Sequence, residues 1–167
     1  PLDKGLPEAE IESSLVRSKA DCIIFESSYI EMISNIKANN KTNVSKFICI
    51  DDDQEEFTKL SELISKGKKL LEEGNKAYLD AKIDSNKMGI MLFTSGTTAI
   101  SKAVMLSHKN IVTNIMDIDE RFNLNDKERF LSFLPLHHVF ECTVGFLYPI
   151  SIGGCICFCE GVKHMAD

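Results

Sequence analysis

A run of small, hydroxyl-bearing and basic residues forms the densest group of reactive side chains in the sequence. It directly follows the apolar run 89–93 and comprises Thr94, Ser95, Gly96, Thr97, Thr98 and Lys102. Small residues let backbone N–H groups approach an anion, hydroxyls add donors, and Lys102 supplies a mobile positive charge. The pattern therefore indicates a loop that binds a polyphosphate, while a polar turn between two strands stays an equally open alternative.

The loop does not fit the common nucleotide-binding pattern G-x-x-x-x-G-K-[ST]. In that pattern, Ser101 would be a glycine and Ala103 would carry the hydroxyl that binds magnesium. Both positions disagree, so the sequence disfavours a P-loop NTPase.

A second segment that could take part in chemistry is 134–141, which reads LPLHHVFE and begins at the last residue of the predicted strand 130–134. His138 and Phe140 could face a ligand, or His138 could cap the next helix while Phe140 joins the core. Open α/β sheets bind ligands at the carboxyl ends of parallel strands. Since both segments follow predicted strands, we expect them to lie at the same edge of a sheet.

Three alternating cysteines, at 155, 157 and 159, invite a zinc or redox interpretation, with His164 nearby. In a strand, side chains at this spacing lie about 6.5–7 Å apart. Thiolates on one zinc must come much closer, since each Zn–S bond is about 2.3 Å. The sequence therefore predicts no metal site here, and these cysteines are expected to be small core residues.

Composition narrows the class of protein. The chain has 167 residues, 44% of them hydrophobic, with a net charge of -6 and a pI near 5.3. Nucleic-acid binding needs a basic face, so nucleic acid is not an expected partner. Without a secretory signal, the six cysteines are expected to be reduced thiols in a cytoplasmic protein.

The uncharged stretch from Cys142 to Cys159 has the length of a short membrane span. Pro149 and the pair Gly153-Gly154 interrupt it. We therefore expect a buried helix followed by a buried strand and no transmembrane span.

The remaining chain alternates between helical and strand patterns. Helices are expected near 8–19 and 28–39, from 57 to either Gly67 or Gly74, and near 107–122 and 139–150; strands are expected at 22–25, 47–50, 89–93, 130–134 and 155–159. Ser28 and Glu31 form a capping-box pattern, and Ser107 is expected to cap the helix with the longest apolar stripe. This alternation predicts a single α/β domain over residues 1–167, with a mostly parallel sheet and helices on both faces.

The first motif resembles a known family. Residues 93–111 are similar to the phosphate-loop motif of the AMP-binding, or adenylate-forming, superfamily, aromatic-T-S-G-T-T-G-x-P-K-G-V, followed in acyl-CoA synthetases by M-L-S-H-x-N. Ala99 and Ala103 replace glycines of that motif, and Ser101 replaces its proline.

Two further segments extend the resemblance. Segment 134–141 resembles the family's next motif, L-P-L-x-H-x-F, and Phe140-Glu141 resembles the form seen in long-chain fatty acyl-CoA ligases. The opening segment 1–7 is similar to an early region of these ligases. The resemblance implies an internal piece of the large N-terminal domain of an adenylate-forming enzyme, truncated at both ends.

The resemblance also implies a reaction and its residues. The parent would be an ATP-dependent, AMP-forming long-chain fatty acid–CoA ligase that uses ATP, Mg²⁺ and CoA. The phosphates of ATP would be bound by Thr94, Ser95, Gly96, Thr97, Thr98 and Lys102. Lys102 would also be catalytic, by neutralising charge on pyrophosphate, and His138 and Phe140 would lie beside the acyl group.

Several alternatives stay open. An acyl-carrier-protein ligase or another adenylating enzyme would share both motifs, and a non-catalytic scaffold domain could retain the fold. The expected partners are a fatty acid, ATP and CoA; the sequence leaves open peripheral membrane contact of the parent and self-association of this piece. Segments expected for adenine, ribose and the adenylating lysine are not recognised, so the piece alone is predicted to be inactive.

Overall fold

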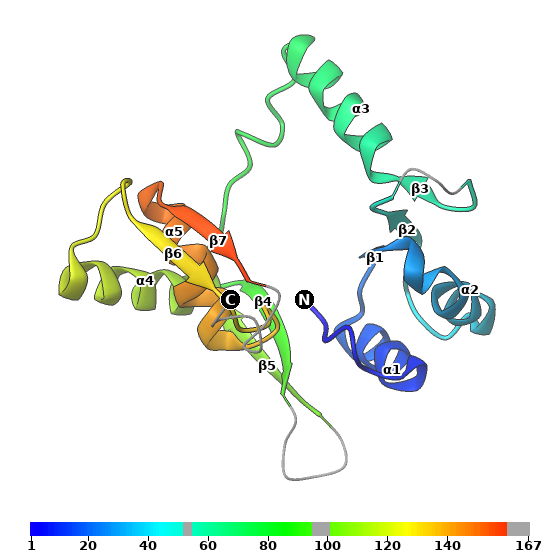
Figure 1. The fold of residues 1–167 in the computed structure, drawn as a ribbon. Helices are drawn as coiled ribbons and strands as arrows, with labels where there is room; N and C mark the ends of the chain where they lie inside the picture. Colours follow the sequence, from blue (N-terminus) through cyan, green and yellow to red (C-terminus); the bar gives the residue numbers. More distant parts are fainter. Residues whose placement is uncertain (52–54, 95–100, 160–167) are drawn as a thin grey trace. The chain divides into compact units, whose positions relative to one another are not determined.

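The computed structural model describes residues 1–51, 55–94 and 101–159 (Figure 1). The chain divides into two compact units: one is Leu6–Ile83, and the other combines Pro1–Gly5 with Asp84–Asp167. Each unit has strands and helices of its own. A single domain over 1–167 stays a prediction.

The unit Leu6–Ile83 contains a small parallel sheet in the order β1-β2-β3. Its elements are α1 (Glu8–Ser18), β1 (Cys22–Phe25), a 3-10 turn η1 (Ser27–Tyr29), α2 (Ile30–Asn39), β2 (Lys46–Cys49), β3 (Thr58–Lys59) and α3 (Leu60–Glu72). Apolar side chains of α1, α2, β1 and β2, and of the residue before β3, form the core, among them Ile11, Leu15, Phe25, Ile33, Ile36, Ile48 and Phe57. The Phe25 and Phe57 rings meet edge to face at 5.1 Å.

Two predicted helix starts in this unit are wrong. The second helix begins at Ile30 after the 3-10 turn, and its N-cap, Tyr29, makes no side-chain capping bond, so the Ser28–Glu31 capping box does not form. The third helix begins at Leu60, because residues 58–59 instead pair with β2. At the third helix, pairing with β2 overrides the local helical pattern.

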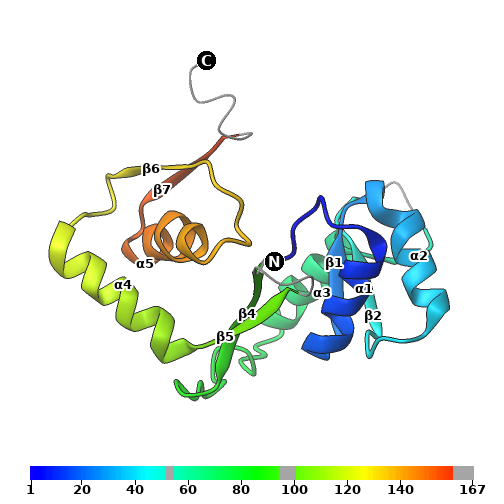
Figure 2. The ribbon, with the colours of Figure 1, turned by 90° about the horizontal axis from the view of Figure 1, so that it is seen from below.

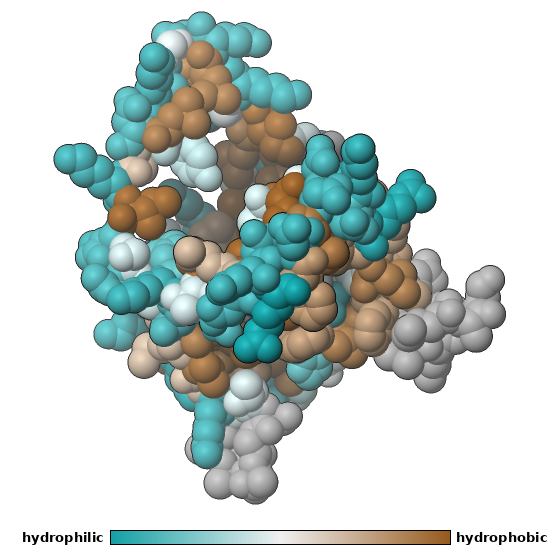
Figure 3. Space-filling model, turned by 90° about the vertical axis from the view of Figure 1, so that its left-hand side faces the viewer, coloured by the Kyte–Doolittle hydropathy of each residue, from teal (hydrophilic) through white to brown (hydrophobic). Residues whose placement is uncertain are grey.

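Helix α3 is amphipathic, and none of its residues is buried. Leu63, Ile64, Leu70 and Leu71 remain exposed. Figure 3 shows apolar side chains among hydrophilic ones at the top of the view, where α3 lies.

The second unit contains two strand pairs, β4–β5 and β6–β7, together with helices (Figure 2). Its elements are β4 (Met88–Thr94), β5 (Lys102–Ser107), α4 (His108–Phe122), β6 (Arg129–Ser132), a π-helix η2 (Glu141–Leu147), α5 (Tyr148–Ile152) and β7 (Cys155–Phe158). Tyr148 is 1% exposed and donates its hydroxyl hydrogen to Asp119 at 3.2 Å, which joins α5 to α4.

Strand β5 was not expected from the sequence, and its pairing corrects the predicted topology. It runs antiparallel to β4, with Thr94 opposite Lys102 and Phe93 opposite Ala103. The first motif therefore joins two antiparallel strands, and it does not leave the end of a parallel strand as predicted. The other three strand pairs among the described residues are parallel. The predicted α/β class with mostly parallel pairing is confirmed.

The helix after β5 follows its local signals. Ser107 is the N-cap of α4, and it forms a capping box with Asn110, as the Ser107 oxygen accepts from the Asn110 N–H at 3.1 Å. Asn123 ends the helix in the left-handed conformation at φ 47°. The predicted Ser107 cap is confirmed.

The stretch 142–159 is divided among three elements: η2, α5 and β7. The predicted helix 139–150 thus becomes a π-helix followed by a short α-helix that carries Pro149 at its start. Within residues 1–51, 55–94 and 101–159, no helix has the length and apolar character needed to cross a membrane.

The prediction that the alternating cysteines are core residues is wrong. Cys155 and Cys157 are exposed on β7, and Cys159 is half-buried just after it. Strand β7 pairs with β6, and this pair forms a separate two-stranded sheet. Across the described parts of the chain, no group of three or more potential metal ligands lies together.

Candidate functional site

The first motif is flanked by the end of one strand and the start of the next. Thr94 is the last residue of β4, Lys102 is the first of β5, and they face each other in the antiparallel register. The side chain of Lys102 is exposed and that of Thr94 is half-buried. A hydroxyl and an ammonium group therefore lie opposite each other at the loop end of the β4–β5 hairpin (the hairpin mouth), where both could donate hydrogen bonds to an anion. The predicted residues Ser95, Gly96, Thr97 and Thr98 lie outside the described residues.

One face of β5 connects this strand end to an apolar cavity. Side chains alternate along a strand, so Lys102, Val104 and Leu106 lie on the same face. Leu106 lies four residues after Lys102, about 13 Å along the strand at the usual rise per residue. A positive charge and an apolar wall are thus held on one rigid element.

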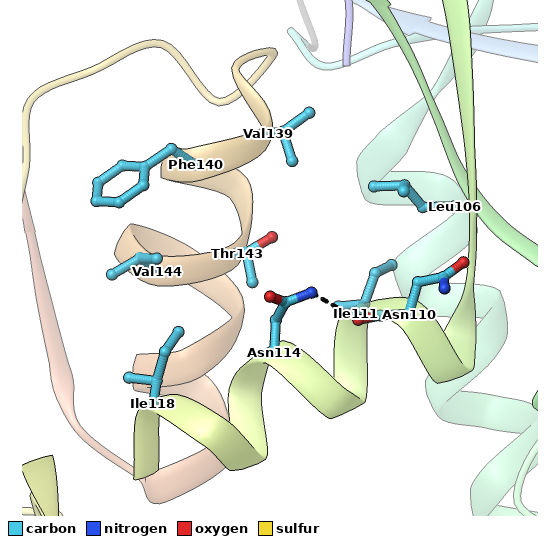
Figure 4. A pocket seen from close by; sticks show the side chains of 9 residues that line it. All are labelled: Leu106, Asn110, Ile111, Asn114, Ile118, Val139, Phe140, Thr143 and Val144. Atoms are coloured by element: carbon cyan, nitrogen blue, oxygen red, sulfur yellow. Dashed lines mark hydrogen bonds between the residues drawn. The ribbon is translucent and has the colours of Figure 1, made fainter. Parts of the chain in front are cut away.

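The cavity lies between α4 and the start of η2, and it encloses about 380 Å³. Figure 4 shows the side chains that line it: Leu106, Asn110, Ile111, Asn114, Ile118, Val139, Phe140, Thr143 and Val144. Most of them are aliphatic or aromatic. Phe140, which the sequence singled out, is part of this wall and is 64% exposed.

The two asparagines of the cavity make hydrogen bonds within their own helix and its cap. Asn110 accepts from the hydroxyl of Ser107 at 2.9 Å, and Asn114 donates to the backbone oxygen of Asn110 at 2.9 Å. Each bond engages one polar atom of its amide, and most of the other side chains that line the cavity are apolar.

His138 and its neighbour lie differently from Phe140. His138 is exposed, and its ring lies 4.6 Å from that of His137 between centroids. His138 does not line the cavity at Phe140. His137 lines a second cavity with the residues 1–4 and lies 3.7 Å from the carboxylate of Asp3. Burial lowers the pKa of His137, an effect that Asp3 opposes.

The sequence indicated some of the cavity wall without assigning it a role. Ile111 and Ile118 belong to the apolar stripe of α4, which predicted a face packed against the core. Ile111 is the one buried residue of this helix, and both Ile111 and Ile118 line the cavity. Leu106 was missed because β5 was missed; its alternation with Val104 was the available signal.

Comparison with known proteins assigns the chain to a family. The family model described as "AMP-binding enzyme" matches residues 1–167, the whole chain. The chain belongs to the AMP-binding enzyme family. Its curated relatives include acid–CoA ligases of different substrate classes. It spans about a quarter of the length of the first relatives it matches.

Two relatives and one solved structure illustrate the similarity. The 4-coumarate–CoA ligase 2 of Petroselinum crispum is 29% identical over 80% of this chain and 23% of its own length. A long-chain-fatty-acid–CoA ligase of Homo sapiens is 39% identical over 46% of this chain and 12% of its own length. The ATP-bound structure of MatB from Rhodopseudomonas palustris shares the fold, with a TM-score of 0.73 at 20% identity, over 96% of this chain and 30% of that one.

Proposed function

We propose that the complete protein is an ATP-dependent acid–CoA ligase that takes a long-chain fatty acid. In the first half-reaction, the carboxylate attacks the α-phosphate of ATP and releases pyrophosphate. In the second, the thiol of CoA attacks the acyl carbon and AMP leaves. The single observation that carries this proposal is that Lys102 and the cavity residue Leu106 lie on the same face of β5.

The anion-binding side of the site would be provided by the hairpin mouth. Thr94 offers a hydroxyl and Lys102 an exposed ammonium group, on strands whose register holds them opposite each other. With Ser95, Gly96, Thr97 and Thr98, these residues would bind the phosphates of ATP, with which Mg²⁺ would enter. Lys102 would offset the charge that develops on the leaving pyrophosphate, and such positioned charge is the main source of rate in reactions of this kind.

The acyl-binding side would be the cavity at Phe140. Leu106, Ile111, Ile118 and Val144 give it an aliphatic wall, and the amides of Asn110 and Asn114 are engaged within their helix. An alkyl chain gains about 0.8 kcal/mol per buried CH₂ in such surroundings. His138 does not line the cavity, and its proposed place beside the acyl group rests on the motif.

A second acid class has support of its own. The 4-coumarate–CoA ligase of Petroselinum crispum matches 80% of the chain, whereas the human long-chain ligase matches 46% at higher identity. Thr143 also contributes a hydroxyl to the cavity wall. A hydroxylated aromatic acid is therefore the alternative substrate.

An exchange assay tests the reaction class, and a thioester assay tests the acid. The complete protein is expected to exchange labelled pyrophosphate into ATP only when a fatty acid is present, and to form its CoA thioester. Exchange with 4-coumarate but not with fatty acids would favour the alternative acid. No exchange with any acid would leave a non-catalytic scaffold, an outcome that the replacements Ala99, Ser101 and Ala103 make worth testing.

The 167-residue chain by itself is proposed to be inactive. It spans about a quarter of the length of its first relatives, and a few exposed ionic contacts give only about 0–1 kcal/mol each. We expect an affinity for Mg-ATP no better than millimolar, about -4 kcal/mol. Calorimetric titration measures this directly; micromolar binding would contradict it.

A further inference from the structure

A buried carboxylate lies directly beside the proposed acyl cavity. Glu141 is 2% exposed and is the first residue of η2, immediately after the cavity residue Phe140. Its oxygen accepts a hydrogen bond at 2.5 Å from the hydroxyl of Ser132, which is itself 3% exposed. Burying a carboxylate is unfavourable unless it is well paired, so this arrangement needs a reason.

The hydrogen bond joins the two ends of one segment. Ser132 ends β6, Glu141 begins η2, and residues 133–140 between them contain both His138 and Phe140. Two backbone bonds shape the second half of this segment: His138 N–H donates to Pro135 at 3.0 Å, and Cys142 N–H donates to His138 at 2.9 Å. The buried contact therefore closes a short loop whose exposed side carries the candidate substrate residues.

Gly145 completes the arrangement from one turn further along η2. A Cβ atom at this position would overlap the carboxylate of Glu141, since the carboxylate lies directly against the Gly145 backbone. Gly145 does not have a positive φ, so the absence of a side chain, and not an unusual backbone, is what the carboxylate requires here. A glycine inside a helix is otherwise unfavourable relative to alanine.

We propose that Glu141 is a positioning residue for the acyl cavity. Ser132 holds the Glu141 side chain by a hydrogen bond, and Gly145 leaves the space that this side chain occupies. In this way Glu141 fixes the start of η2 and the position of Phe140 in the cavity wall. Glu141 itself does not line the cavity. The inference rests on the proposed function, because it gives the cavity the acyl group as its ligand.

Three substitutions in the complete protein remove the contact by different routes. Ser132→Ala deletes the donor, Glu141→Ala deletes the acceptor, and Gly145→Ala displaces the carboxylate while both partners stay. Each is expected to change the ratio of kcat/KM between long and short acids at least about fivefold, with the KM for ATP within about threefold. Loss of a single hydrogen bond can account for a change of this size.

Two further variants separate positioning from a general loss of stability. Glu141→Gln keeps the length of the side chain and an oxygen that accepts from Ser132, so it is expected to retain the wild-type ranking of acids. Ser14→Ala removes a hydroxyl that is 3% exposed, as that of Ser132 is, but in the other unit. It is expected to leave the ranking unchanged, whatever it does to the melting temperature.

Amide hydrogen exchange gives a readout that does not depend on activity. Ser132→Ala and Gly145→Ala should speed exchange at the N–H groups of His138 and Cys142, and Ser14→Ala should not. Unchanged exchange at both groups, or an unchanged ranking of acids in active Ser132→Ala and Gly145→Ala enzymes, would overturn the inference. Failure of the proposed function is distinct: the wild-type protein then activates no acid, while the exchange result still decides what Glu141 positions.

Discussion

Replacing Phe140 by alanine should change which acids the complete protein prefers. Phe140 lines the cavity between α4 and η2, yet 64% of it is exposed, so this fraction is what an acyl chain can cover. Full burial of a large apolar side chain contributes about 1.5–3 kcal/mol, and about two thirds of that is about 1–2 kcal/mol. Phe140→Ala should therefore lower kcat/KM about 5- to 30-fold for acids that reach this residue.

The assay compares saturated acids of increasing length through formation of the CoA thioester, with the KM for ATP measured in parallel. Acids too short to reach Phe140 should be affected least, and the KM for ATP should stay within a few-fold. Phe158→Ala is a matched control, because Phe158 is also 64% exposed but lies on β7 and does not line the cavity. An equal loss for all chain lengths, or an unchanged profile with a higher KM for ATP, would refute the reasoning.

Three other predictions concern the hairpin, the cap of α4 and the end of β2. Lys102→Ala in the complete protein should slow adenylation about 10- to 150-fold, the effect expected from losing a charge-assisted hydrogen bond. Hydrolysis of preformed acyl-adenylate should be unaffected. Equal losses in both assays would indicate that Lys102 has a structural role. Ser107→Ala should lower the free energy of unfolding by about 1 kcal/mol in a urea titration, because it removes the capping bond to Asn110, whereas no change would mean that the cap is dispensable. The backbone N–H of Ser27 donates to Asp51 at 2.6 Å and lowers its pKa, so this contribution to stability is present above the unfolded pKa and is lost as pH falls through the lower folded one. The difference in melting temperature between wild type and Asp51→Asn should therefore be present at pH 6 and vanish at strongly acidic pH, and a gap that grew on acidification would reverse the assigned sign.

Local signals predicted the parts of the structure that depend on neighbouring residues. Helix α4 carries its cap, Ser107, and its apolar stripe within one short stretch, and both the helix and its cap are as predicted. Phe140 reaches the cavity for the same reason, since the motif places it just before η2. The family resemblance also depended on contiguous residues, and the family is confirmed.

Features set by distant partners were not predictable in the same way. Strand β5 exists because Lys102 to Ser107 pair with β4, a partner that the local sequence of 102–107 does not indicate. Residues 141–147 form a π-helix where the sequence pattern predicts an ordinary helix. Pro149, near the start of α5, has no N–H to donate to the preceding turn. The exposed cysteines of β7 show that an apolar strand pattern gives the conformation of a segment but not what covers it.

The number of residues between Lys102 and Leu106 on β5 determines whether the positive charge and the cavity lie on the same face of the strand. Lys102 and Leu106 share a face because an even number of residues separates them. A single residue inserted between them would turn Lys102 to the opposite side, while two inserted residues would keep the side and move it about 7 Å farther away. The hairpin thus tolerates changes of length in steps of two, so length variants of this strand in related proteins should differ by even numbers wherever activity is retained.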